Sequence, residues 1–199
     1  MSITWIIFFA IIVAFAGVCL SYVYYELKTG VPTFPTMPAM QEKIIALLRA
    51  DMAARPHIRP YTIIDLGSGS GQMTQRIARA LPEARIIGIE ISFVPWLRSY
   101  VRQKFFGPTN VVYKRLDFWP YDSSEADAVI TYLLASIIDR VGTKLRRELK
   151  PGTLILANTF PLGDGWQPVE TFSIDAPFFA SLSGKTNLYQ YRQTATPAA

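Results

Sequence analysis

The chain has 199 residues, of which 50% are hydrophobic, and it carries a formal net charge of +5. Its single cysteine, Cys19, excludes a framework of intramolecular disulfides. The basic residues are spread along the chain without an arginine-rich tract, which favours attraction to anionic lipid headgroups over binding of nucleic acid. We therefore expect no nucleic-acid partner, and we expect no metal ion.

The first predicted element is an apolar helix at the N-terminus. Residues 3–25 contain no charged side chain and are dominated by Ile, Phe, Val and Ala. About 20 apolar residues are enough to cross a bilayer as a helix, so the sequence predicts a transmembrane helix. A cleaved signal peptide is the alternative, because Ala14-Phe15-Ala16 resembles a small-x-small cleavage site. The absence of basic residues before the apolar stretch argues against cleavage.

The basic residues indicate how this helix is oriented. No Lys or Arg precedes it, whereas Lys28, Lys43 and Arg49 follow it. By the positive-inside rule, the rest of the chain is expected on the cytoplasmic side of the inner (cytoplasmic) membrane. The sequence thus predicts a single-pass protein that contacts the lipid bilayer through residues 3–25.

Beyond the anchor, short β-like runs alternate with segments of helical periodicity. Strands are expected at 62–66, 85–90, 111–115, 128–132 and 153–160, and helices at 40–54, 72–81, 95–106 and 135–149. This succession predicts an α/β fold with a doubly wound, mostly parallel Rossmann-like sheet. Two late β-like runs, 169–174 and 188–192, are expected to complete it as an antiparallel edge. The predicted parts are an anchor (1–29), a connecting loop with an amphipathic helix (30–60), a cofactor-binding domain (61–194) and a flexible tail (195–199).

The most informative motif follows the first strand of this domain. Residues 63–71 read Ile-Ile-Asp-Leu-Gly-Ser-Gly-Ser-Gly, an apolar run that contains Asp65 and continues into Gly67, Gly69 and Gly71. Glycine lets the main chain turn sharply and approach a ligand, because it has no Cβ. Dinucleotide-binding folds use a different spacing, G-x-G-x-x-G. A plain strand-to-helix turn that needs left-handed backbone is the alternative explanation.

Two further acids end the next predicted strands. Glu90 lies about 25 residues after Asp65, near the offset at which an acidic side chain accepts the hydroxyls of a ribose. Asp117 follows the next β-like run. The carboxyl ends of parallel strands meet at one edge of a sheet, so the sequence predicts a nucleoside-containing cofactor at that edge.

These motifs resemble the class I S-adenosylmethionine-dependent methyltransferases. A narrower resemblance is to the membrane-anchored protein-lysine methyltransferases that modify the adenine nucleotide translocase and the ATP synthase c subunit. It is carried by segments 64–72, 88–90, 117–119, 144–149 and 159–162. The resemblance implies S-adenosyl-L-methionine as the cofactor and a protein substrate, such as a membrane protein, in which a lysine accepts the methyl group.

The resemblance also assigns roles to individual residues. Those assigned to the cofactor are Asp65, Gly67, Ser68, Gly69, Gly71, Glu90, Asp117, Phe118 and Thr36. Tyr132, at the end of the fourth strand, is the candidate catalytic residue that faces the acceptor. Phe160 and Trp166 are candidates for the wall of a channel that admits an amine, although a surface loop is the alternative place for Trp166.

The chain departs from the second family in its glycine loop. Ser70 and Gln72 stand where that family tends to have an acidic and a basic residue. This departure concerns the lysine substrate more than the fold or the cofactor. Two other functions therefore stay open, which are methylation of a lipid or a hydrophobic small molecule, and a non-enzymatic role as a membrane-tethered cofactor-binding or scaffold protein. The sequence identifies no catalytic base.

Overall fold

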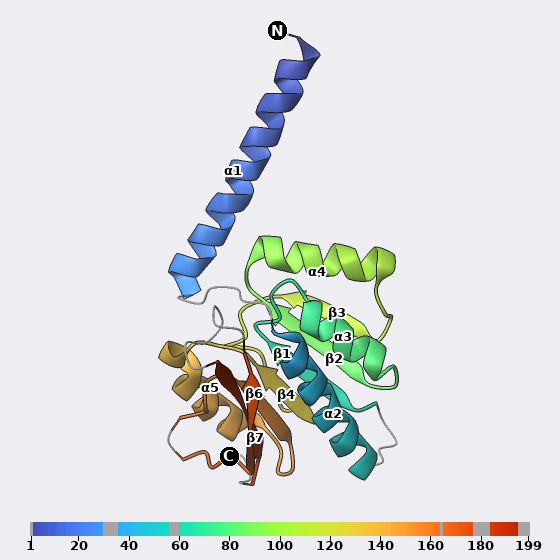
Figure 1. The fold of residues 1–199 in the computed structure, drawn as a ribbon, viewed down its shortest axis with the longest axis vertical. Coiled ribbons are helices and arrows are strands. Elements are labelled where there is room, and N and C mark those ends of the chain that lie inside the picture. The colour runs from blue at the N-terminus through green and yellow to red at the C-terminus, as the bar shows by residue number, and fades with distance from the viewer. Residues whose placement is uncertain (1, 30–35, 56–59, 164, 177–183, 195–199) are drawn as a thin grey trace.

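The computed structural model describes residues 2–29, 36–55, 60–163, 165–176 and 184–194 (Figure 1). Seven strands form one sheet in the order β3-β2-β1-β4-β5-β7-β6. Their bounds are β1 Thr62–Leu66, β2 Arg85–Glu90, β3 Val111–Arg115, β4 Ala128–Thr131, β5 Leu154–Asn158, β6 Glu170–Asp175 and β7 Lys185–Arg192. Strands β1 to β5 are parallel, and β7 lies antiparallel between β5 and β6. The predicted doubly wound, mostly parallel sheet is confirmed.

Helices cover both faces of this sheet. Their bounds are α1 Ile3–Thr29, α2 Pro38–Ala54, α3 Gln72–Ala80, α4 Phe93–Phe106 and α5 Ala135–Glu148. Ile63 of β1 shares one core with α2 and α3, whereas Ile64 and Leu66 share the other core with α5. All five residues of β1 are buried, because successive side chains point to opposite faces and both faces are covered.

The face that α5 covers is completed by the loop between β3 and β4. Lys144 of α5 has a side chain only 4% exposed, and its Nζ lies 2.5 Å from the Glu148 carboxylate. The same ammonium donates to the main-chain oxygen of Tyr121 at 2.5 Å, and the Ser123 amide donates to Glu148 at 3.1 Å. This buried ion pair holds the loop against α5.

The observed bounds follow the predicted ones closely, with two informative differences. Strand β5 ends at Asn158, before the predicted end at residue 160, because Thr159 adopts a left-handed φ of 69° that a strand cannot continue. The two late runs complete the sheet as its antiparallel edge, as predicted, with β6 outermost, but β7 begins at Lys185 and is longer than expected. The predicted tail 195–199 lies outside the described residues.

The N-terminal helix α1 extends away from the sheet (Figure 1). Within the described residues, Ile3–Tyr25 is the one stretch long and apolar enough to cross a membrane by length and composition, and none of it is buried. Helix α1 contacts α4. Tyr25 Oη lies 3.2 Å from the guanidinium of Arg115, which donates a hydrogen bond to it.

Candidate active site

The glycine loop lies between the end of β1 and the start of α3. Gly67, Gly69 and Gly71 have φ values of 77°, 54° and 73°, in the left-handed region that favours glycine. The amides of Gly67 and Ser68 both donate to the Ile89 carbonyl oxygen, at 3.0 and 2.9 Å. The loop is therefore fastened to the carboxyl end of the neighbouring strand, β2.

At Gly71 the requirement for glycine is steric as well as conformational. A Cβ built there would lie 2.5 Å from Tyr113 Oη and 2.7 Å from Ser99 Cβ. The Tyr113 hydroxyl also donates to the Gly71 carbonyl oxygen at 3.1 Å. The glycines thus permit the left-handed backbone and the close packing of a tight turn, and the turn places their amides at the carboxyl edge of the sheet.

The Glu90 carboxylate lies directly beside this loop. One of its oxygens accepts a hydrogen bond from the Gly69 amide at 2.8 Å, and the other accepts one from the Ser92 amide at 2.7 Å. An ionised carboxylate offers about four acceptor sites, so each oxygen keeps a further site for a hydroxyl donor. The position and acceptor capacity of Glu90 fit the two hydroxyls of a ribose.

Asp65 has a different environment. Its carboxylate points to the α3 side of the sheet and accepts a hydrogen bond from the Thr74 hydroxyl at 2.6 Å. Burial raises the pKa of Asp65 to about 6; the Thr74 hydrogen bond opposes this rise and the negative charge of Glu90 adds to it. The carboxylate therefore ties β1 to α3 and fixes the path of the glycine loop between them.

Asp117 and Phe118 follow β3 at the same edge. The Leu116 amide donates to the Glu90 carbonyl oxygen at 3.2 Å, so this segment stays beside β2 after the strand ends. Asp117 Oδ1 accepts from the Trp119 amide at 3.0 Å. The rings of Phe118 and Trp119 are 4.8 Å apart and half-buried. An acid and an aromatic pair therefore stand next to the predicted ribose position.

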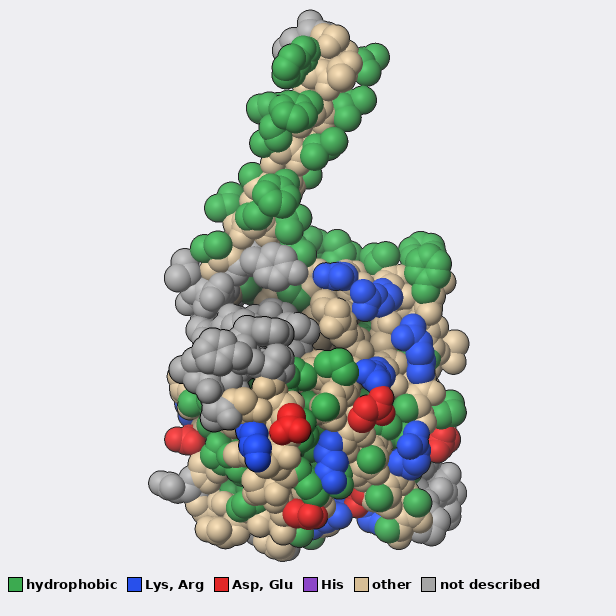
Figure 2. Space-filling model, in the orientation of Figure 1, with side chains coloured by type: hydrophobic (Ala, Val, Ile, Leu, Met, Phe, Trp, Pro, Cys, Tyr) green, Lys and Arg blue, Asp and Glu red, His purple; other side chains and the backbone are tan. Residues whose placement is uncertain are grey.

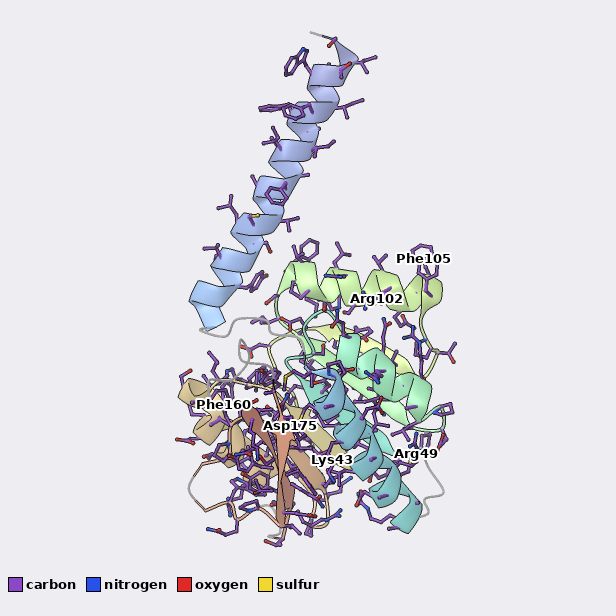
Figure 3. The ribbon with its side chains drawn as sticks, viewed as in Figure 1. Lys43, Arg49, Arg102, Phe105, Phe160 and Asp175 are labelled. Carbon is purple, nitrogen blue, oxygen red and sulfur yellow. The ribbon has the colours of Figure 1, made fainter. Side chains whose placement is uncertain are left out.

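Thr36, Tyr132 and Phe160 lie on segments next to other elements. The Thr36 carbonyl oxygen accepts from Gln41 at 2.5 Å, which fixes Thr36 to α2. Tyr132 directly follows β4, which neighbours β1. From β1 the sheet is extended in one direction by β2 and β3, and in the other direction by β4 and β5. The strand order therefore reverses between β1 and β4, and Tyr132 lies at this topological switch point. Phe160 lies beyond the end of β5 (Figure 3).

Trp166 lies in the core that α5 shares with Ile64 and Leu66 of β1. Its Nε1 donates to the Gly142 carbonyl oxygen at 3.0 Å, and its ring packs edge-on against Tyr191 with centroids 5.8 Å apart. The Arg146 guanidinium lies 4.6 Å above the same ring. The surface-loop alternative for Trp166 is wrong, because α5 and β7 bury the indole, and its nitrogen is already bonded within the core.

Sequence reasoning identified the loop and the strand-end acids but missed the residues that hold them. Thr74, Tyr113 and Ser92 each make a hydrogen bond to a member of the motif. The sequence signal for Thr74 was its place in the first turn of a helix that follows the loop. The described residues contain no group of three or more His, Cys, Asp or Glu that could hold a metal ion.

Residues 65–170 match the family model described as the ANTKMT methyltransferase domain, which is more than half of the 199 residues. The chain belongs to this family. As a family member it is an S-adenosylmethionine-dependent methyltransferase, and the class I fold predicted from its sequence is confirmed. The glycine loop and the Glu90 carboxylate have the conformation and acceptor sites to hold S-adenosylmethionine, which supplies the methyl group when bound.

Two proteins of known function are similar to most of this family member. A protein-lysine N-methyltransferase from Saccharolobus islandicus is 26% identical over 148 residues, covering 73% of this chain and 88% of that protein. The adenine nucleotide translocase lysine N-methyltransferase of Mus musculus is 30% identical over 149 residues, covering 72% of this chain. The alignment spans only 58% of the mouse protein.

A solved structure shares both fold and sequence with the chain. An RNA methyltransferase from Salinibacter ruber, in complex with S-adenosyl-L-homocysteine, superposes with a TM-score of 0.67 at 26% identity. The match covers 83% of this chain and 97% of the Salinibacter protein. S-adenosylhomocysteine is the product that S-adenosylmethionine leaves after methyl transfer.

Proposed function

We propose that this family member is a membrane-anchored methyltransferase that transfers the methyl group of S-adenosylmethionine to a lysine of a protein. The observation that carries the proposal is the similarity, over about three quarters of the chain, to two enzymes named for lysine methylation. The departures at Ser70 and Gln72 leave the glycine turn itself intact, because the three glycines keep their left-handed conformations.

In this proposal each site residue has a defined role. The backbone from Gly67 to Gly71 approaches the donor closely, and Ser68 contributes a buried hydroxyl that has no partner among the described atoms. Glu90 accepts the ribose hydroxyls, while Asp117 and Phe118 contact the adenine. Thr36 closes over the cofactor, and Tyr132 faces the acceptor from the switch point. Asp65 acts as a positioning residue through Thr74.

The chemistry is a displacement at the methyl carbon. The lysine ammonium first loses a proton to solvent. The neutral Nζ lone pair then forms the new C–N bond while the C–S bond breaks with its electron pair going to sulfur, which gives a methylammonium and S-adenosylhomocysteine. A free lysine has a pKa near 10.4, so little neutral amine exists at neutral pH. Desolvation and the neighbouring sulfonium charge both favour the neutral amine. The protein contributes mainly by orienting the two reactants and excluding water.

Membrane anchoring supplies the proximity of enzyme and substrate. Helix α1 has the length and composition of a membrane span, and the distribution of Lys and Arg favours a cytoplasmic position for the domain. A substrate lysine on another membrane protein would share the same two-dimensional space. Such confinement raises the effective concentration of the reactants without any new contact.

The test follows a labelled methyl group into classes of acceptor. The full-length protein in lipid nanodiscs is incubated with methyl-labelled S-adenosylmethionine and membranes of its source cells. Protein, lipid extract and RNA are then counted separately, and the protein is hydrolysed to amino acids. The proposal predicts label in methyllysine. Label confined to lipid or to RNA would refute the lysine acceptor, and binding of S-adenosylmethionine without any transfer would favour the scaffold function.

A further inference from the structure

Helix α4 exposes most of its large apolar side chains to solvent. Its buried residues are only Pro95 and Ser99, although most of its residues are apolar or aromatic. A surface helix of a globular protein normally turns its apolar side chains toward the core and its polar ones toward water. In α4, only Trp96 among the large side chains packs against the adjacent core.

The exposed side chains form a stripe. Phe93, Leu97, Val101 and Phe105 follow one another at four-residue spacing, which places them on one side of a helix. They are 40%, 38%, 42% and 71% exposed, and the next residue, Phe106, is 82% exposed. Figure 2 shows hydrophobic side chains along the edge of the domain nearest α1, and Figure 3 shows Phe105 projecting from α4 away from the sheet.

Cationic side chains flank this stripe. Helix α4 contains no Asp or Glu and carries Arg98, Arg102 and Lys104. Two more arginines approach its ends, since the Arg115 guanidinium lies 4.9 Å from the Phe93 ring and Arg79 donates to the carbonyl oxygen of the last helical residue at 3.4 Å. An apolar stripe flanked by positive charges of this kind is typical of a helix that lies in the surface of an anionic bilayer.

The position of α4 relative to α1 agrees with that arrangement. Helix α1 leaves the domain on the side where α4 lies, and α4 runs across the direction of α1 (Figure 1). The two helices are in contact, and Arg115 bonds to Tyr25 at the domain end of the predicted span. If α1 crosses a bilayer, α4 lies along its surface with the exposed stripe toward the lipid.

We propose that α4 is a second membrane contact, an interfacial helix that binds anionic lipid in the plane of the bilayer that α1 spans. This inference rests on the proposed membrane anchoring. Helix α4 begins directly after the Ser92 amide that bonds to Glu90, so fixing α4 on the lipid also fixes the cofactor site at a set height above the membrane. The acceptors that the enzyme reaches are then lysines close to the lipid surface.

The test measures membrane depth at single labelled cysteines in the full-length protein. Vesicles contain phosphatidylcholine with phosphatidylglycerol and a nitroxide-labelled lipid. A fluorescent label at Cys19 reports on α1, and the same label in Cys19→Ser/Phe105→Cys reports on α4. The matched control is Cys19→Ser/Arg49→Cys, since Arg49 is exposed on α2, away from α4 (Figure 3). We expect quenching at 105 to be strongest for a nitroxide about 5–10 Å below the headgroups, and no quenching at 49.

The outcomes separate this inference from the anchoring on which it rests. Quenching at 19 and 105 but not at 49 supports an interfacial α4. Quenching at 19 alone overturns the inference and leaves α1 as an anchor, whereas no quenching at either site overturns both. As a second measurement, Leu97→Ser/Val101→Ser should lower the quenching at 105 while binding of S-adenosylmethionine stays unchanged. Unaltered quenching in that variant would also overturn the inference.

Discussion

Replacement of Asp65 by asparagine should remove a pH-dependent loss of stability. The carboxyl of Asp65 is buried, and its pKa is raised because water cannot solvate its charge. A carboxyl whose pKa is higher in the folded protein than in the unfolded chain binds its proton more tightly when folded. Its contribution to stability is therefore fully present below the unfolded pKa and is lost as the pH rises through the folded pKa.

The size of the effect follows from the two pKa values. The rise from 3.8 to about 6 corresponds to about 3 kcal/mol, at about 1.4 kcal/mol per pKa unit. Between pH 4 and pH 7, the free energy of unfolding of the wild-type protein should fall by about 2 kcal/mol relative to Asp65→Asn, because the rest of the total is already lost below pH 4. Asparagine can still accept the hydrogen bond of Thr74, so the tie between β1 and α3 persists in the variant.

Urea titrations of both full-length proteins in a nonionic detergent, with tryptophan fluorescence as the readout, measure the difference in their free energies of unfolding at each pH. The variant also changes local packing, but a packing change shifts the difference by the same amount at every pH. The dependence on pH therefore isolates the ionisation of Asp65. A difference that stays flat between pH 4 and pH 7 would show that Asp65 is not held in the environment described above.

Three other substitutions have defined outcomes. In Gly71→Ala, the clash with Tyr113 and Ser99 and the left-handed backbone should together cost about 1–3 kcal/mol of stability, measured by urea unfolding. In Phe118→Leu, loss of stacking on adenine should weaken the binding of S-adenosylmethionine by about 1–3 kcal/mol, measured by calorimetry. In Lys144→Met, the Glu148 carboxylate loses its buried partner and keeps only the exposed Arg147 and the Ser123 amide, which should cost about 3 kcal/mol of stability.

Each of these substitutions has a matched control. Like Gly71, Gly184 has a positive φ, of 69°, but a Cβ there would meet open space. Gly184→Ala therefore measures the stability cost of the left-handed backbone without the clash. Phe172→Leu removes a ring from the other core, on β6, and should leave cofactor affinity unchanged. Arg147→Met removes an exposed partner of Glu148 and should change stability little. Equal effects in a substitution and its control would contradict the corresponding argument.

The central strands could be predicted from the sequence because their signal is local. Strands β1, β2 and β3 have the predicted bounds. β1 and β2 are mainly apolar runs, the first followed by Gly67 and the second ending at Glu90, and β3 is a β-like run that comes shortly before Asp117. The acid at 90 was placed beside the glycine loop because parallel strands end at a common edge. The strand bounds depend on neighbouring residues in the chain, and the place of Glu90 follows from the general geometry of parallel sheets.

Features that depend on distant residues could not be predicted in this way. The burial of Trp166 arises from Gly142 and Tyr191, which lie in other elements, and the segment that carries Trp166 has no periodicity of its own. The helix near residues 95–106 was predicted, but the face that it buries was not, since that face is set by packing on β2 and β3.

Calorimetric titration of the full-length protein with S-adenosylmethionine tests most directly whether the cofactor site is where we place it. The comparison includes Glu90→Ala, which removes the proposed ribose ligand, and Glu83→Ala, an exposed acid in the loop before β2. We expect one molecule bound by the wild-type protein and by Glu83→Ala, with binding lost or strongly weakened in Glu90→Ala. Undiminished affinity in a folded Glu90→Ala variant would contradict the site.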